Sequence, residues 1–121
     1  MRVDKLAKAA VAALEDIKAR DIVVLDVKKM TSLFDKIIIA SADSSRQTRA
    51  LSSNVQEKLK ALGAKVYGVE GEQAGEWVLI DLGSVVVHIM QPAIRQYYNL
   101  EELWAPPAGT ARRRASKAAA S

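Results

Sequence analysis

The chain has 121 residues, half of them hydrophobic, which fits one domain built around one core. It contains no cysteine, so disulfide bonds, thiolate zinc sites and cysteine nucleophiles are excluded. The formal net charge is +4, and the segment from Ala105 onward supplies all of it, so the neutral remainder argues against a broad phosphate-binding face.

An amphipathic helix is predicted at the start of the chain, over residues 3–20. Apolar residues recur there at helical spacing, with polar residues on the opposite side: Leu6, Ala9, Ala10, Ala13, Leu14 and Ile17. Two short β-branched runs follow, at 22–25 and 37–39. Continuous apolar runs of this kind predict central strands that are covered on both faces.

A second helix is predicted over residues 45–62. Ser44 and Ser45 are N-cap candidates, and Gly63 stands where a left-handed C-cap is favoured. One face of this helix is apolar: Leu51, Val55, Leu59 and Leu62. This face is expected to cover the strands.

The C-terminal half is predicted to be mainly β-structure. A strand is expected within 64–69, and a β-hairpin is expected from 77–82 and 85–90 around Gly83 and Ser84. Pro92 suits the first turn of a short helix, and residues 100–104 form one more helical turn.

These elements predict an α/β fold, with a single domain over residues 1–105 and a mixed β-sheet of about five strands flanked by helices. Residues 106–121 are Ala-rich and basic without apolar periodicity, so a disordered tail is expected there. No apolar run approaches the roughly 20 residues of a membrane-spanning helix. The N-terminus carries acids where a signal peptide is apolar. A cytoplasmic protein with no membrane partner is therefore expected.

The most specific part of the sequence is the stretch WVLIDLGSVVVHIMQPAIRQYYNLEELW. It resembles the signature of the Iojap/RsfS family of ribosomal silencing factors, in which Trp-x-Leu-Ile-Asp, Val-Val-Val-His and Arg-x-Tyr-Tyr-x-Leu-Glu-x-Leu-Trp occur in this order. Ser45-Arg46-Gln47, Glu70-Gly71 and Gly75 also match, so the resemblance extends over residues 6–104.

The resemblance implies a nucleotidyltransferase-like fold, a homodimer, and binding to large-subunit ribosomal protein L-fourteen on the inter-subunit face. A protein bound there would sterically block joining of the small and large subunits and would repress translation under nutrient limitation. It also implies that the hairpin and the C-terminal segment form one ribosome-facing surface. The candidate contact residues are Trp77, Leu79, Asp81, Arg95, Tyr98 and Leu100.

Physical arguments leave alternatives open for these residues. Trp77, Leu79 and Asp81 alternate along one strand and share a face. Trp77 suits an interface, because its large apolar body and N–H favour half-wet sites, but it also suits the core. If the second helix buried this face, Asp81 would need a partner such as Arg95. The C-terminal aromatic segment could equally be a lid over the sheet.

A second group of residues has either an anion-binding or a structural interpretation. Asp35, together with Ser45, Arg46 and Gln47 at a helix N-terminus, could form an anion or nucleotide pocket, although simple helix capping is the commoner role. His88 is the only histidine, and in an apolar strand it is more often a hydrogen-bonded structural residue than a ligand.

Catalysis is not expected from this sequence. Gly83-Ser84 is followed by no carboxylate before Glu101, so the paired-metal chemistry of nucleotidyltransferases has no visible ligands, and we expect no catalytic residue, metal or cofactor. The alternative hypothesis is a nucleotide-binding enzyme or pseudo-enzyme that uses Asp35, Ser45 and Asp81. A third hypothesis assigns ribosomal RNA contacts to the basic tail.

Overall fold

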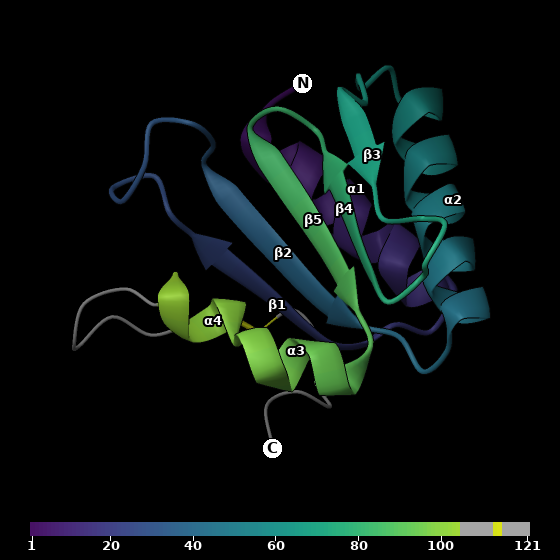
Figure 1. The fold of residues 1–121 in the computed structure, drawn as a ribbon. Coiled ribbons are helices and arrows are strands. Elements are labelled where there is room, and N and C mark those ends of the chain that lie inside the picture. Colours follow the sequence, from purple (N-terminus) through teal and green to yellow (C-terminus); the bar gives the residue numbers. More distant parts are fainter. Residues whose placement is uncertain (105–112, 115–121) are drawn as a thin grey trace.

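The computed structural model describes residues 1–104 and the strand residues 113–114, and Figure 1 shows their arrangement. Six strands form one mixed sheet in the order β3-β4-β5-β2-β1-β6. In chain order the elements are α1 (Val3–Asp16), β1 (Arg20–Asp26), β2 (Lys36–Ser41), α2 (Ser45–Ala61), β3 (Gly68–Glu70), β4 (Trp77–Asp81), β5 (Val85–Met90), α3 (Pro92–Tyr98), α4 (Leu100–Leu103) and β6 (Arg113–Arg114). The predicted α/β class is confirmed.

The centre of the sheet is the pair β2 and β5, which are its only parallel neighbours within the described strands. Ile37 pairs with Val86 and Ile39 pairs with His88 in this register. The other neighbours are antiparallel. All six residues of β5 are buried, and so are the last five of β2, as expected for strands covered on both faces.

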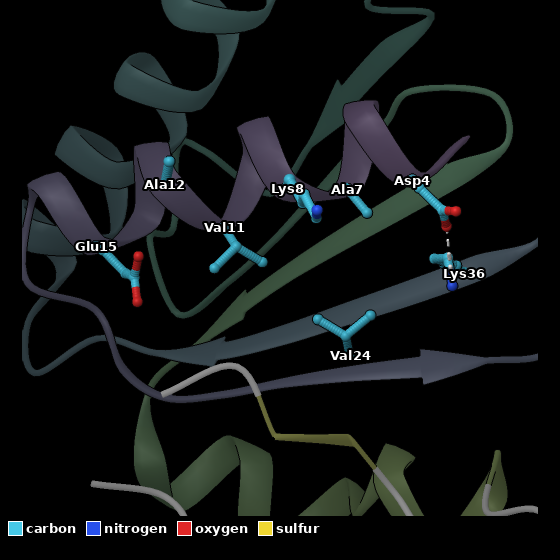
Figure 2. A pocket seen from close by; sticks show the side chains of 8 residues that line it. All are labelled: Asp4, Ala7, Lys8, Val11, Ala12, Glu15, Val24 and Lys36. Carbon is cyan, nitrogen blue, oxygen red and sulfur yellow. Dashed lines mark ion pairs between the residues drawn. The ribbon is translucent and has the colours of Figure 1, made fainter. Parts of the chain in front are cut away.

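Helix α1 ends at Asp16, earlier than the predicted limit at residue 20. Lys18 has φ 62° and Asp21 has φ 49°, so the chain turns sharply before β1 instead of continuing the helix. Figure 2 shows α1 lying over β1 and β2, with Val11 and Val24 pointing toward one another. At its start, Asp4 forms an ion pair with Lys36 of β2 at 3.7 Å.

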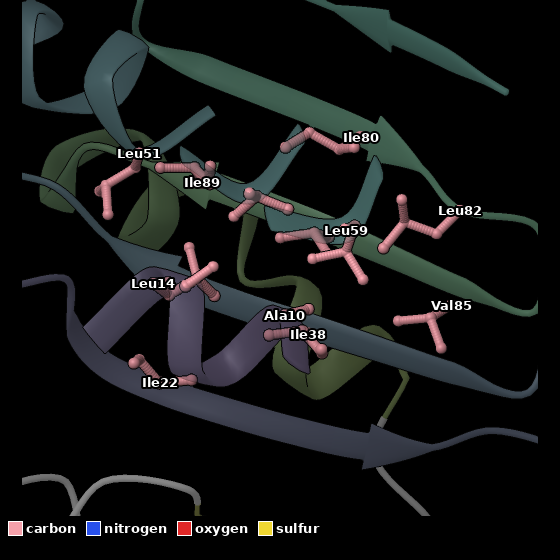
Figure 3. Close-up of a cluster of buried hydrophobic side chains, with 14 of the residues drawn as sticks. Ala10, Leu14, Ile22, Ile38, Leu51, Leu59, Ile80, Leu82, Val85 and Ile89 are labelled. Atoms are coloured by element: carbon pink, nitrogen blue, oxygen red, sulfur yellow. The ribbon is translucent and has the colours of Figure 1, made fainter. Parts of the chain in front are cut away.

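The main core lies between the sheet and the helices α1 and α2. Leu14 of α1 and Leu51 of α2 are fully buried against Ile38 of β2 and Ile89 of β5, as Figure 3 shows. These strand residues alternate with residues that face the opposite side. One face of the sheet therefore packs against the two helices.

The predicted second helix is confirmed as α2, with Ser44 as its N-cap. The Ser44 hydroxyl accepts a hydrogen bond from the backbone N–H of Gln47 at 3.0 Å. Farther along, Asn54 Nδ2 donates to the carbonyl oxygen of Ala13 at 2.8 Å. The cap satisfies the start of α2, and the Asn54 bond fixes α2 against α1.

Strand β6 lies within the segment that the sequence predicted to be a disordered tail. Arg114 pairs with Val23 and Arg113 pairs with Val24, so two residues extend the sheet beyond β1. Residues 106–112 and 115–121 of that segment are outside the described residues.

Candidate functional site

The second face of the sheet is only partly covered. A smaller core packs there under the C-terminal helices, where Ile37, Ile39 and Met90 contact Ile94 of α3 and Leu100. Figure 1 shows α3 and α4 lying across one end of the sheet, on the side away from α1 and α2. The remaining part of this face, along β4 and β5, has no helix over it.

A groove of about 580 Å³ lies on this uncovered part. Its walls come from β2, β4, β5 and the flanking loops, and they include Ile37, Tyr67, Leu79, Val86, His88 and Trp104. Most of these side chains are apolar, and the polar exceptions include Asp81 and His88. Such a surface suits a partner with an apolar body and a few polar groups.

Trp77, Leu79 and Asp81 share this second face, as the strand alternation predicted. All three are half-buried, so neither a fully exposed face nor a core position describes them. Helix α2 covers the opposite face, and Asp81 therefore does not need Arg95 as a partner. Its carboxylate instead accepts a hydrogen bond from the backbone N–H of Gly83 at 2.8 Å and closes the hairpin turn.

Trp77 is held between two other side chains. Its indole Nε1–H donates to Nδ1 of His88 at 2.9 Å, and its ring lies 4.9 Å from the ring of Tyr98, centroid to centroid. Tyr98 in turn packs edge-on against Tyr97 at 5.0 Å. The hairpin and α3 thus form one aromatic surface, in which Tyr98 is 52% exposed and Tyr97 is 81% exposed.

His88 is buried and neutral at physiological pH. Burial lowers its pKa to about 4 from the ordinary value of 6.5, because the apolar surroundings disfavour the imidazolium form. Its hydrogen bond with Trp77 fits the structural role that the sequence favoured. His88 also lines the groove, so it faces the candidate binding surface as well.

Arg95 is directed into the protein and presents little charge at the surface. Its Nε donates to Glu101 Oε1 at 2.8 Å, and its Nη1 donates to the carbonyl oxygen of Asp21 at 2.7 Å and to Ser41 Oγ at 2.8 Å. These bonds join α3 to β1, β2 and the following helix. Arg95 therefore holds α3 in place, while Leu100 packs partly buried against the smaller core.

The C-terminal segment combines the two roles that the sequence left open. Leu100 and Trp104 pack over the sheet as a lid, and Trp104 meets Phe34 edge-on at 5.5 Å. Tyr97 and Tyr98, by contrast, remain exposed. The segment is thus a lid at one end of the face and an open aromatic surface at the other.

The proposed anion pocket is not brought together. Asp35 precedes β2 and Ser45 follows it, so the six residues of β2, about 20 Å of strand, separate them. Gln47 links the helices, since its Nε2 donates to the carbonyl oxygens of Ile17 and Lys18 at 3.1 and 3.2 Å. Arg46 is exposed at the helix start. These contacts agree with the capping interpretation.

Another cavity, of about 500 Å³, lies between α1 and the strands β1 and β2 (Figure 2). It is lined by small apolar side chains and by charges of both signs, including Lys8 and Glu15. None of the candidate site residues named from the sequence lines this cavity.

Within residues 1–104 and 113–114, no group of three or more His, Asp or Glu side chains is placed to hold a metal ion. No helix in the same part of the chain has the length and apolar character that crossing a bilayer requires.

Three groove residues with large side chains lie in loops and were not among the candidate residues named from the sequence: Leu33, Phe34 and Tyr67. Leu33 is 80% exposed and Tyr67 is 61% exposed, with Lys65 Nζ lying 4.8 Å from the Tyr67 ring centroid. Large apolar residues next to turn residues were the available signal. Their relation to the hairpin depends on the sheet topology.

The sequence and the fold are similar to those of known proteins. A family model described as "Ribosomal silencing factor during starvation" matches residues 1–120. The ribosomal silencing factor RsfS of Chromobacterium violaceum is 53% identical over 104 residues, which are 86% of this chain and 85% of that protein. The chloroplastic protein Iojap of Zea mays is 40% identical over 102 residues, or 82% of this chain and 41% of that protein. A crystal structure of a Chromobacterium violaceum protein has a TM-score of 0.85 and 50% identity, covering 98% of this chain and 97% of that one.

Proposed function

Because the chain belongs to the family of ribosomal silencing factors that includes RsfS and Iojap proteins, we propose that it binds the large ribosomal subunit and prevents the small subunit from joining. The partner is ribosomal protein L-fourteen on the inter-subunit face. Occupying that face lowers translation when nutrients are limiting, in agreement with the family description of silencing during starvation.

The observation that carries this proposal is the uncovered sheet face with its groove and aromatic border. Trp77 and Tyr98 are in contact there, and both combine a large apolar surface with a polar group, as residues that dominate protein interfaces commonly do. The groove beside them is mostly apolar and open to a partner. A partner that docks along β4 and α3 would bury both features at once.

The proposed contact residues divide by role. Trp77, Leu79, Asp81, Tyr98 and Leu100 form the surface that meets ribosomal protein L-fourteen. Arg95 supports this surface from beneath by holding α3, because its guanidinium is bonded inside the protein.

The action is steric, so the protein is proposed to be a cytoplasmic binding factor without catalytic activity or a cofactor. Nucleotide chemistry that uses Asp35, Ser45 and Asp81 is not favoured, because β2 separates the first two residues. Association into a homodimer is also proposed, and sedimentation equilibrium of the purified protein tests it.

Sucrose-gradient sedimentation tests the proposal. Purified small and large subunits are mixed with increasing amounts of the protein, and each fraction is probed for the protein and for joined ribosomes. Comigration with the large subunit and a dose-dependent loss of joined particles are expected. If the protein stays at the top of the gradient and joining is normal, the proposed function is wrong. Calorimetry with a nucleoside triphosphate and Mg²⁺ then tests the nucleotide alternative.

A further inference from the structure

The groove contains a hydrogen-bond donor whose position is fixed by the protein itself. The indole nitrogen of Trp77 can only donate, so Nδ1 of His88, 2.9 Å away, must accept. A neutral imidazole that accepts at Nδ1 carries its hydrogen on Nε2. The low pKa of His88, about 4, keeps the ring neutral at pH 7. One tautomer is therefore selected.

The Nε2–H of His88 is open to the groove. His88 lines the groove and is 8% exposed. In the described part of the chain, the hydrogen bond of its ring is the one with Trp77, and no buried side-chain nitrogen or oxygen lacks a partner. Nε2 is therefore reached by solvent. A partner that fills the groove must supply an acceptor there or leave the donor unpaired, which is unfavourable.

The surroundings select the chemistry of that acceptor. Leu79 is the register partner of His88, and Asp81 is its diagonal neighbour on the same face, about 7–8 Å away between Cα atoms. The Asp81 carboxylate disfavours a second anion in this space, such as a phosphate or carboxylate. The nearby walls, including Ile37 and Val86, are apolar. A neutral carbonyl oxygen on a protein segment fits both conditions.

We propose that His88 determines specificity in the groove: its Nε2–H, held in place by Trp77, donates a hydrogen bond to a neutral carbonyl oxygen of the docked ribosomal protein. The inference rests on the proposed function, because the acceptor belongs to the partner in the groove. Trp77 then has two roles. It contacts the partner directly, and it selects the tautomer that offers the donor.

Two substitutions at His88 distinguish the hydrogen bond with Trp77 from the donor at Nε2. In His88→Asn, the side-chain oxygen can still accept from Trp77 Nε1, but no group takes the place of Nε2–H. In His88→Gln, the longer side chain can place an N–H near the position of Nε2. Ser52→Ala, which removes a hydrogen bond to Glu72 on the α2 side of the sheet, controls for loss of stability.

Dissociation constants are measured for purified large subunits and for purified ribosomal protein L-fourteen. His88→Asn is expected to weaken both by about tenfold, the effect of one lost neutral hydrogen bond. His88→Gln should recover part of the loss, and Ser52→Ala should bind as the unaltered protein does. Nitrogen-15 NMR of the free protein should show hydrogen on Nε2 and none on Nδ1.

Each result has a distinct meaning. Equal binding by His88→Asn and the unaltered protein overturns the inference while the proposed function stands. A loss seen with subunits and absent with the isolated protein places the acceptor elsewhere and also overturns it. Hydrogen on Nδ1 in the free protein overturns it without any ribosomal measurement, even if His88→Asn does not fold. If the unaltered protein binds neither partner, the proposed function fails first.

Discussion

Trp77 on β4 and His88 on β5 are joined diagonally across the hairpin by a hydrogen bond of 2.9 Å between Nε1 and Nδ1. The bond fixes one edge of the indole, and Tyr98 packs against its ring. The position of Trp77 is thus determined before any partner arrives. Such preorganisation reduces the entropy lost on binding.

Replacing Trp77 is expected to weaken binding while leaving the protein folded. In Trp77→Ala, affinity for large subunits should fall at least about tenfold, as for a central interface aromatic. The free energy of unfolding should fall by only about 2 kcal/mol, because Trp77 is half-buried. Co-sedimentation and urea denaturation measure the two effects. Leu62→Ala, at an exposed site near the end of α2, is the control. Unchanged co-sedimentation of Trp77→Ala would remove Trp77 from the interface.

Stability should decrease as the pH falls from 7 to 5. The folded pKa of His88, about 4, is below its unfolded value of 6.5, so below pH 6.5 the unfolded chain takes up a proton that the folded protein does not. His88 should therefore contribute a loss of about 2 kcal/mol between pH 7 and 5. Titratable groups on the same face of the sheet include Asp81, which lines the groove with His88, and Tyr98, which packs against Trp77.

Urea denaturation at both pH values measures this contribution. Carboxylates titrate in every variant, so the informative quantity is the difference between the unaltered protein and His88→Asn. The variant should lose about 2 kcal/mol less on acidification. Identical losses in the two proteins would show that His88 is not buried in its neutral form.

Gly71 and Gly68 offer a matched pair of backbone positions. Gly71 has φ 89°, and an added Cβ would lie 2.0 Å from the carbonyl oxygen of Trp77. Gly71→Ala should therefore cost at least about 2 kcal/mol of unfolding free energy and displace the start of β4. Gly68→Ala meets open space and should change stability by less than about 0.5 kcal/mol. Thermal unfolding compares them, and equal melting temperatures would contradict this account.

Arg95 should matter for stability far more than an exposed arginine does. Its side chain is 10% exposed, and Arg95→Ala leaves Glu101 without this ion pair, at a cost of about 3 kcal/mol. Arg20 pairs with Asp43 at the surface, so Arg20→Ala should have little effect. Urea denaturation measures both. Similar losses in the two variants would mean that the Arg95 contacts do not hold α3.

The basic segment should add salt-sensitive affinity for ribosomal RNA. Replacing its four cations (Arg112, Arg113, Arg114 and Lys117) with Gln keeps the chain length and removes the charge. The dependence of large-subunit binding on salt concentration should become less steep in this variant. If affinity and its salt dependence stay the same, the segment makes no phosphate contacts.

Local patterns predicted the elements and the shared face of β4 well. Alternation along 77–81 places Trp77 and Asp81 on one face whatever the topology, because strand geometry has a period of two. The N-cap of α2 could also be predicted, since Ser44 precedes Gln47 by the three-residue spacing that capping requires. Such features depend on neighbours in sequence.

Contacts between residues that are distant in the sequence could not be predicted from it. Asp35 and Ser45 are ten residues apart, yet they lie beyond the two opposite ends of strand β2. The sequence predicted Arg95 as a contact residue, whereas its guanidinium is bonded to Asp21 and Ser41, which belong to β1 and β2 and are distant in sequence. Patterns in sequence show which residue types are present, whereas the topology decides which of them meet.

The parallel pairing of β2 with β5 has a consequence for folding during synthesis. Ile37 pairs with Val86, so the middle of the sheet cannot form until α2, β3, β4 and β5 have all left the ribosome. Contacts that join distant parts of a chain form slowly. Until then, β2 offers an apolar edge to other chains in the cell, and such edges promote aggregation. A factor proposed to act on ribosomes thus forms the centre of its own sheet only after Met90 has been translated.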